Sequence, residues 1–163
     1  MLIQKQERQL ILNLNDMRVK CILKIEKQVS KEKYPVNNSR EYLEIGKIYN
    51  VYGIFFYKGV LNYLIVGQYE KLDEYRTPPT WEPIYLFELV DGEFPPGWYF
   101  KYGGDDAYLE KLIDPSSAVL GYKELACNVS HKDKLLEREA EDIKIFLKRK
   151  HEIDAWEKNK TDE

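Results

Sequence analysis

Apolar and polar residues alternate over the segment 17–25. A period of two places the apolar side chains on one face of a β-strand, so this segment predicts a strand. The apolar positions are Val19, Cys21, Leu23 and Ile25. The preceding residues, 1–16, mix Gln, Asn, Lys and Leu without a settled period, and we interpret them as an N-terminal extension.

The segment 45–102 is dense in Tyr, Trp, Phe and β-branched residues. Its first stretch, 48–57, is apolar on both faces that a strand would present, which predicts a central strand covered on both sides. One face would carry Tyr49, Val51, Phe55 and Tyr57, and the other Ile48, Tyr52, Ile54 and Phe56. Gly53, in the middle of the stretch, predicts a bulge or a sharp bend.

A turn signal, Lys58-Gly59, predicts that the next segment returns antiparallel to the first. In that segment, Leu61, Tyr63 and Ile65 would share one face, and Leu64 and Val66 would share the other. Three more strands are predicted at 81–91, 98–102 and 118–122, because Gly, Pro and Asp clusters separate these apolar stretches.

The period changes to that of a helix after residue 130. Ser130 and Asp133 resemble an N-cap with an acidic third position. An apolar stripe of Leu136, Ala140, Ile143 and Leu147 follows at spacings of four, three and four, widened by Leu135, Phe146 and Ile153. We expect a helix with one buried face, a break near Glu139, and fraying after Trp156.

These elements together predict an α+β fold. The expected form is a curled antiparallel sheet or a small, partly open β-barrel of SH3-like style, with a C-terminal helix or helix pair packed on it. One globular domain would span 17–157, with a β-rich part at 17–122 and a helical part at 130–157. Residues 158–163 would form a frayed tail.

Composition indicates a globular chain of one domain: of 163 residues, 33% are charged and 44% are hydrophobic. The longest uncharged apolar run, 48–57, is about half of what a membrane-spanning helix needs. We therefore expect no membrane association and, because the N-terminus lacks a secretory pattern, a cytoplasmic location. Cys21 and Cys127 are expected to remain separate, reduced residues.

Charge is uneven along the chain. The segment 41–100 carries four Lys and Arg against nine Asp and Glu, although the whole chain has a net charge of −3. An acidic, aromatic surface disfavours nucleic acid, whose phosphates require basic side chains, and it suits a basic protein partner. The alternative is that these acids only keep a sheet solvated.

The search for catalytic groups yields weak candidates. Gly103-Gly104 is followed by Asp105-Asp106, which would repel phosphate. His131 and His151 lie too far apart on a helix to share a metal ion. Cys127 and His131 have helical spacing, but a nucleophile also needs an orienting group and an oxyanion donor. We therefore expect no catalytic residue, no metal and no cofactor.

Several short motifs, however, resemble those of a known group of proteins. They are Ile45-Gly46-Lys47-x-Tyr49-x-Val51-Tyr52-Gly53, Trp81, Leu86–Gly92, Gly97–Phe100, Gly121-Tyr122-x-Glu124-Leu125, Glu137–Glu139 and Ile145-Phe146. The pattern covers roughly 17–155 and resembles small bacterial cytoplasmic proteins that are similar to immunity proteins of polymorphic or contact-dependent toxin systems. The extension 1–16 departs from it.

The resemblance implies a protein that binds one cognate toxin domain, such as a nuclease, and blocks its active or substrate-binding surface. It implies no catalytic residues. The acids and aromatic residues expected to contact the toxin are Asp73, Glu74, Glu82, Asp91, Glu93, Asp105, Asp106, Trp81, Trp98 and Tyr102. Aromatic anchors would supply most of the affinity and charge complementarity would speed association.

Two other functions fit the sequence. One is a non-catalytic adaptor or regulatory module that binds a peptide or a carbohydrate through an aromatic patch. The aromatic set Trp81, Tyr85, Trp98, Tyr99 and Tyr102 could stack on a sugar ring or a nucleobase, or it could form an aromatic core with hydroxyl groups at its rim. A hydrolase using Cys127 and His131 is the third interpretation.

Overall fold

A computed structural model describes residues 17–24, 40–57, 59–68, 78–102 and 117–161. The strands are β1 (Arg18–Cys21), β2 (Ile48–Asn50), β3 (Gly53–Tyr57), β4 (Val60–Val66), β5 (Pro79–Pro83), β6 (Phe87–Asp91), β7 (Tyr99–Tyr102) and β8 (Ala118–Gly121). The helices are the 3-10 helix η1 (Ile84–Leu86) and the α-helices α2 (Lys123–Cys127), α3 (Val129–Glu137) and α4 (Ala140–Thr161).

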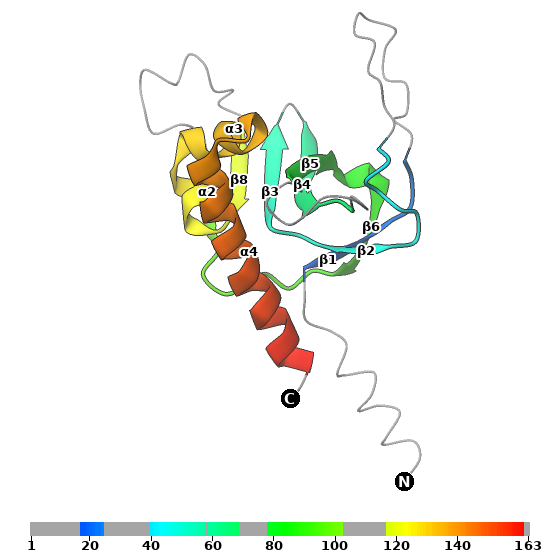
Figure 1. Ribbon diagram of the computed structural model, residues 1–163. Helices are drawn as coiled ribbons and strands as arrows, with labels where there is room; N and C mark the ends of the chain where they lie inside the picture. Colours follow the sequence, from blue (N-terminus) through cyan, green and yellow to red (C-terminus); the bar gives the residue numbers. More distant parts are fainter. Residues whose placement is uncertain (1–16, 25–39, 58, 69–77, 103–116, 162–163) are drawn as a thin grey trace, which may run out of the picture.

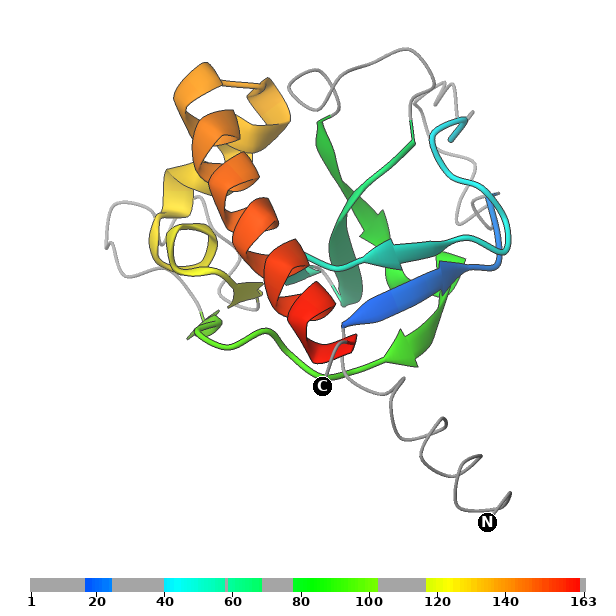
Figure 2. The same cartoon turned by 60° about the horizontal axis from the view of Figure 1, so that its bottom comes forward.

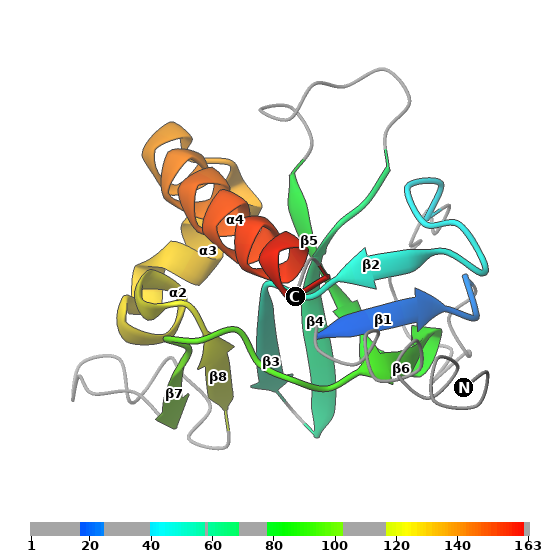
Figure 3. The ribbon, with the colours of Figure 1, turned by 90° about the horizontal axis from the view of Figure 1, so that it is seen from below.

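The strands form two antiparallel sheets, which confirms the predicted α+β class (Figure 1). One sheet has three strands in the order β2-β1-β6, and the other has five in the order β5-β4-β3-β8-β7. Within the part of the chain that the structure describes, neither sheet closes into a barrel. Seen from below, the helices gather on one side, β1, β2 and β6 lie on the other, and β3 and β4 run between them (Figure 3).

Two buried clusters hold these layers together, and β4 contributes to both. Leu64 packs with residues of α2, α3 and α4, whereas its neighbour Ile65 packs with residues of β1 and β2. Successive side chains of a strand point to opposite faces, so β4 is covered on both sides. The predicted division of this strand into Tyr63 and Ile65 on one face, and Leu64 and Val66 on the other, is confirmed.

The face assignment of the preceding strand is correct only up to Gly53. Val51 belongs to the cluster around β1, as expected, but Ile54 packs on the same cluster. Phe55 instead contacts Trp81, which belongs to the helix-side cluster, with ring centroids 5.6 Å apart. The break between β2 and β3 thus exchanges the two faces, because one extra residue in a strand shifts the alternation by one.

The predicted strand 81–91 is divided into two. β5 pairs with β4 in the five-stranded sheet, whereas β6 pairs with β1 in the three-stranded sheet. The 3-10 helix η1 forms the corner between them. β5 begins and ends with proline, which suits its place at the edge of its sheet.

The helical part contains one more helix than predicted, and its break is where the sequence indicates. Asn128, not Ser130, caps α3, because its side chain accepts a hydrogen bond from the backbone N–H of Ser130. Arg138 takes the left-handed conformation (φ 60°) and ends α3. This turn reorients the apolar stripe, so Leu136 is 55% exposed instead of buried. The short helix α2 was not predicted, and α4 continues past Trp156 to Thr161.

Close packing of α2 on the five-stranded sheet requires two glycines. Gly53 of β3 and Gly121 of β8 are paired across the sheet, and the Leu125 side chain of α2 lies over both. A methyl group built at Gly53 would lie 2.4 Å from Leu125 Cδ2. This contact places the start of α2, and therefore Tyr122 and Lys123, beside α4.

Candidate functional site

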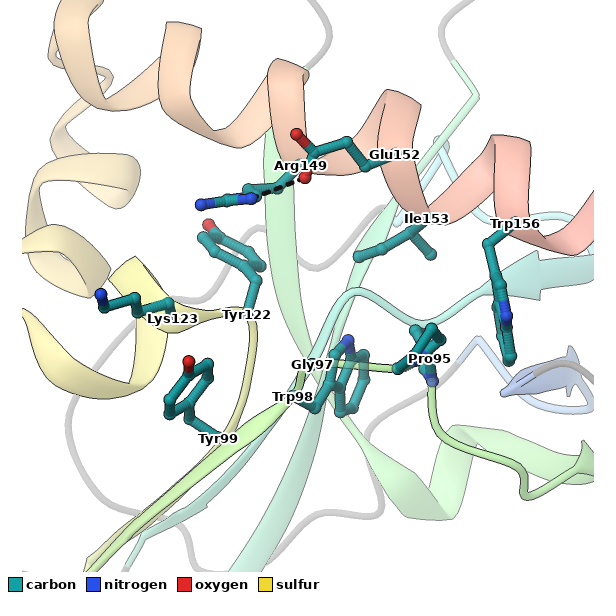
Figure 4. Close-up of a pocket in the computed structure, with 11 residues that line it drawn as sticks. Pro95, Gly97, Trp98, Tyr99, Tyr122, Lys123, Arg149, Glu152, Ile153 and Trp156 are labelled. Atoms are coloured by element: carbon teal, nitrogen blue, oxygen red, sulfur yellow. Dashed lines mark hydrogen bonds and ion pairs between the residues drawn. The ribbon is translucent and has the colours of Figure 1, made fainter.

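A pocket of about 330 Å³ lies between the link from β6 to β7, the start of α2 and the second half of α4 (Figure 4). It is lined by Pro95, Pro96, Gly97, Trp98, Tyr99, Tyr122, Lys123, Arg149, Glu152, Ile153 and Trp156. Figure 2 shows the C-terminal end of α4 beside the link that brings the prolines to this place. The volume and the mostly apolar, aromatic lining are typical of sites that bind small ligands or side chains of a partner.

Trp98 forms one wall of the pocket. Its ring stacks on Phe94, with centroids 5.6 Å apart, and packs against the cluster around β1. Its indole nitrogen Nε1 is buried and has no hydrogen-bond partner among the residues that the structure describes. In Figure 4 this nitrogen lies at the edge of the ring turned toward α4. A buried donor without an acceptor is uncommon in folded proteins and calls for an explanation.

The charged residues at the pocket form a short network. Arg149 donates to both carboxylate oxygens of Glu124, over 2.7 and 2.8 Å, and to Glu152 over 2.6 Å. Hydrogen bonding to Arg149 lowers the pKa of the Glu124 carboxyl, and the two carboxylates raise the pKa of the guanidinium. Lys123, in contrast, forms no ion pair with any residue in the described ranges.

Behind the pocket, Tyr122 begins a buried chain of polar side chains. The Tyr122 hydroxyl lies 2.8 Å from His131 Nε2, and His131 Nδ1 lies 2.5 Å from a carboxylate oxygen of Asp142. A neutral imidazole with its proton on Nδ1 satisfies all three groups, because Tyr122 then donates to Nε2. His131 is fully buried. These three side chains join the start of α2, where Tyr122 is the N-cap, to α3 and α4.

The hydrogen bonds from Tyr122 through His131 to Asp142 determine which groups of Tyr122 and His131 are available for chemistry. Burial strongly raises the pKa of the Tyr122 hydroxyl, so it stays protonated and acts as a donor. Both ring nitrogens of His131 are occupied by Tyr122 and Asp142, and Cys127 is exposed. Cys127 is therefore not packed beneath the start of the helix, and His131 is a buried residue and not a solvated one. The geometry gives no support to a hydrolase that uses this pair.

Next to the pocket, β7 presents a row of aromatic side chains to solvent. Phe100 is 68% exposed and Tyr102 is 67% exposed, and Tyr99 contributes to both β7 and the pocket. β7 is at the edge of the five-stranded sheet, where it pairs with β8. Among the described residues, it differs from the opposite edge, β5, in having no proline.

The structure separates the residues that the sequence grouped as contacts. Asp73, Glu74, Asp105 and Asp106 lie outside the described residues. Trp81 is part of the helix-side core, where it packs against Phe55, whereas Trp98 lines the pocket and Tyr102 lies on β7. Tyr85 lies in η1. The five aromatic residues considered together therefore do not form one surface.

Two of the acidic candidates are buried. Glu82 is 3% exposed and accepts hydrogen bonds from Arg40 Nε, over 2.7 Å, and from the Tyr42 hydroxyl. A partner that docks without rearranging the sheet cannot reach this carboxylate. Asp91 is also buried and accepts a hydrogen bond from the backbone N–H of Glu93 over 2.9 Å, which leaves Glu93 as the exposed acid of this turn.

Sequence reasoning did not identify four residues of the site: Tyr122, Lys123, Arg149 and Trp156. The Gly121-Tyr122 motif is a signal for Tyr122. Its hydrogen-bond partner His131 lies nine residues further along the chain, and the two side chains meet only because α2 and α3 turn back on each other. Arg149 and Trp156 occupy polar and terminal positions of the helical pattern, where nothing indicates which element they face.

Two further findings concern the described residues only. They contain no group of three His, Cys, Asp or Glu side chains placed to hold a metal ion. Their helices also lack the combination of length and apolar composition needed to cross a membrane. Comparison of the chain with protein-family models, with curated proteins and with solved structures yields no match.

Proposed function

We propose that this protein is an immunity protein that binds a cognate toxin domain and blocks its active or substrate-binding surface. The observation that carries the proposal is the row of exposed aromatic side chains on β7. Exposed aromatic residues on an ordered sheet edge are unfavourable in water unless a partner covers them, and aromatic residues dominate the energetically important centres of protein interfaces.

Fewer acidic side chains are available for a toxin contact than the sequence predicted. Of the acidic candidates in the described ranges, Glu93 is exposed, whereas Glu82 and Asp91 are buried. We therefore assign the affinity to the aromatic side chains of β7, and to Glu93 a contribution to the rate of association. A basic toxin surface, as on a nuclease, remains the partner that the acidic segment 41–100 favours.

Co-expression with the products of the neighbouring genes tests this function. An immunity protein protects cells from one of these products and co-purifies with it in a one-to-one complex. A lack of protection and of co-purification with every neighbouring product would contradict the proposal.

Variants of β7 test the surface. Replacing Phe100 and Tyr102 together by Ser removes two exposed rings, and we expect the complex to weaken by about thirtyfold or more, because even one anchor residue contributes about 2 kcal/mol or more. Ile45→Ser is the matched control, since Ile45 is 61% exposed and lies three residues before β2 in the sequence. Figure 3 shows β2 and β7 on opposite sides of the molecule. Equal loss of binding in the control would refute the assignment to β7.

The second candidate is a non-catalytic adaptor that binds a peptide or a carbohydrate. The aromatic pocket beside Trp98 favours it, because a pocket of this size is not required for an interface built on β7. A saturable hit on a glycan or peptide array, together with no toxin partner, would favour the adaptor.

A further inference from the structure

We propose that the pocket between Trp98, Tyr122 and Trp156 is a binding site for an apolar carboxylate, meaning a carboxylate group carried on a hydrophobic body. The proposal does not depend on the immunity function. It rests on the shape and lining of the pocket, on its local charge, and on the unpartnered donor of Trp98.

The lining provides an apolar enclosure for the body of such a ligand. Four aromatic rings and two prolines come from three separate segments of the chain, and Ile153 completes the apolar surface. A volume of about 330 Å³ is at the lower end of the range for small-molecule sites, which suits one ring with a short side chain.

One cation of the lining is available to an anion. The pocket residues include two cations, Lys123 and Arg149, and one carboxylate, Glu152. Arg149 is paired with Glu152 and with Glu124, which does not line the pocket, so Lys123 is the lining cation that forms no ion pair with a described residue. Lys123 is exposed at the start of α2 and is the cation that can turn toward a bound carboxylate.

The indole N–H of Trp98 favours an acceptor. It is a buried donor, and within the described part of the structure no lining side chain has a buried acceptor that lacks a partner. A ligand that brings an acceptor therefore satisfies a group that costs about 1–3 kcal/mol when unpaired. Because Trp98 Nε1 is buried, the indole ring must shift when a ligand binds to this nitrogen. The resonance of the Trp98 indole N–H reports this shift.

Nuclear magnetic resonance of the uniformly ¹⁵N-labelled protein tests the proposal. The three indole N–H resonances are assigned with Trp98→Phe, Trp81→Phe and Trp156→Phe. The probes are three molecules of nearly one shape: 3-phenylpropionate, its neutral amide and 3-phenylpropylamine. We expect a saturable shift of the Trp98 resonance with the carboxylate, a weaker effect with the amide and none with the amine.

Variants identify the contacts. We expect Trp98→Phe, which keeps a ring but removes the donor, to weaken carboxylate binding by about tenfold. Trp81→Phe is the matched control, because Trp81 also has a buried, unpartnered indole nitrogen but does not line the pocket. Lys123→Gln changes an exposed residue without disturbing the fold, and we expect it to weaken binding by about threefold.

The carboxylate could belong to a free acid or to the C-terminus of another chain. The tripeptide Ala-Ala-Phe distinguishes them: tighter binding than 3-phenylpropionate, lost on C-terminal amidation, indicates a chain terminus, whereas weaker binding indicates a free acid. Equal shifts with all three probes, no saturable shift up to about 10 mM, or unchanged affinity in both Trp98→Phe and Lys123→Gln would overturn the proposal.

Discussion

Removal of the Asp142 carboxylate tests whether the buried chain from Tyr122 to Asp142 stabilises the fold. In Asp142→Ala, the His131 ring remains fully buried but its Nδ1–H loses the acceptor at 2.5 Å. A buried donor without a partner costs about 1–3 kcal/mol. Asp142 also lies in the first turn of α4, where a carboxylate adds about 0.3–1 kcal/mol. We expect the free energy of unfolding to fall by about 2–3 kcal/mol.

Urea denaturation, followed by circular dichroism and by tryptophan fluorescence, measures this loss. For a chain of this length, it corresponds to a fall in melting temperature of about 5–10 °C. The matched control is Asp133→Ala. Asp133 is 62% exposed and pairs with Lys132 on the surface of α3, so its removal should change the free energy of unfolding by less than about 0.5 kcal/mol.

A double-mutant cycle with Tyr122→Phe sharpens the test. Both substitutions act on the same ring of His131, so their effects should differ from additivity by about 0.5 kcal/mol or more. If Asp142→Ala is as stable as the wild type, or if Asp133→Ala costs as much, then the polar chain does not hold α3 and α4 together and the reasoning is wrong.

Three further predictions follow from local contacts. In Gly53→Ala, the new methyl group would lie 2.4 Å from Leu125 Cδ2, so we expect a loss of about 1–3 kcal/mol in urea denaturation. Hydrogen bonding to Arg149 lowers the pKa of Glu124, so this carboxylate contributes stability that is complete above its unfolded pKa and is lost as the pH falls through the folded pKa. Glu124→Gln should therefore flatten the dependence of the free energy of unfolding on pH in the acid range below the unfolded pKa of Glu, about 4.3. The exposed thiol of Cys127 should react with a thiol reagent in the native protein. Cys21 is buried, and burial raises the pKa of its thiol, so Cys21 should react only after unfolding.

Controls exist for each of these. Gly92→Ala should be tolerated, because the added methyl group would lie 3.4 Å from Leu89 Cδ2, an ordinary contact. Glu88→Gln replaces an exposed residue of β6 and should change the free energy of unfolding at pH 7 by less than about 0.5 kcal/mol. Cys127→Ser should leave no rapidly reacting thiol, and two fast thiols in the native wild type would show that the structure around Cys21 is wrong.

Local patterns in the sequence were sufficient for most strands and for the break between the last helices. The turn at Gly59, the alternating faces of β4 and the end of α3 near residue 138 all depend on neighbours within a few positions. Side chains repeat on one face about every two residues in a strand and about every 3.6 residues in a helix. Both periods are properties of the backbone, so residues close together in the sequence are enough to detect them. The α+β class follows from these elements alone.

Tertiary structure decided how these elements divide between layers and where polar groups meet. The bend at Gly53 exchanged the faces of β3, and the corner η1 moved β6 into a second sheet. Glu82 became buried because Arg40, 42 residues away in sequence, lies beside it. The pocket joins segments more than 20 residues apart. Such contacts depend on the packing of whole elements and on the burial that results, and no short-range pattern encodes either.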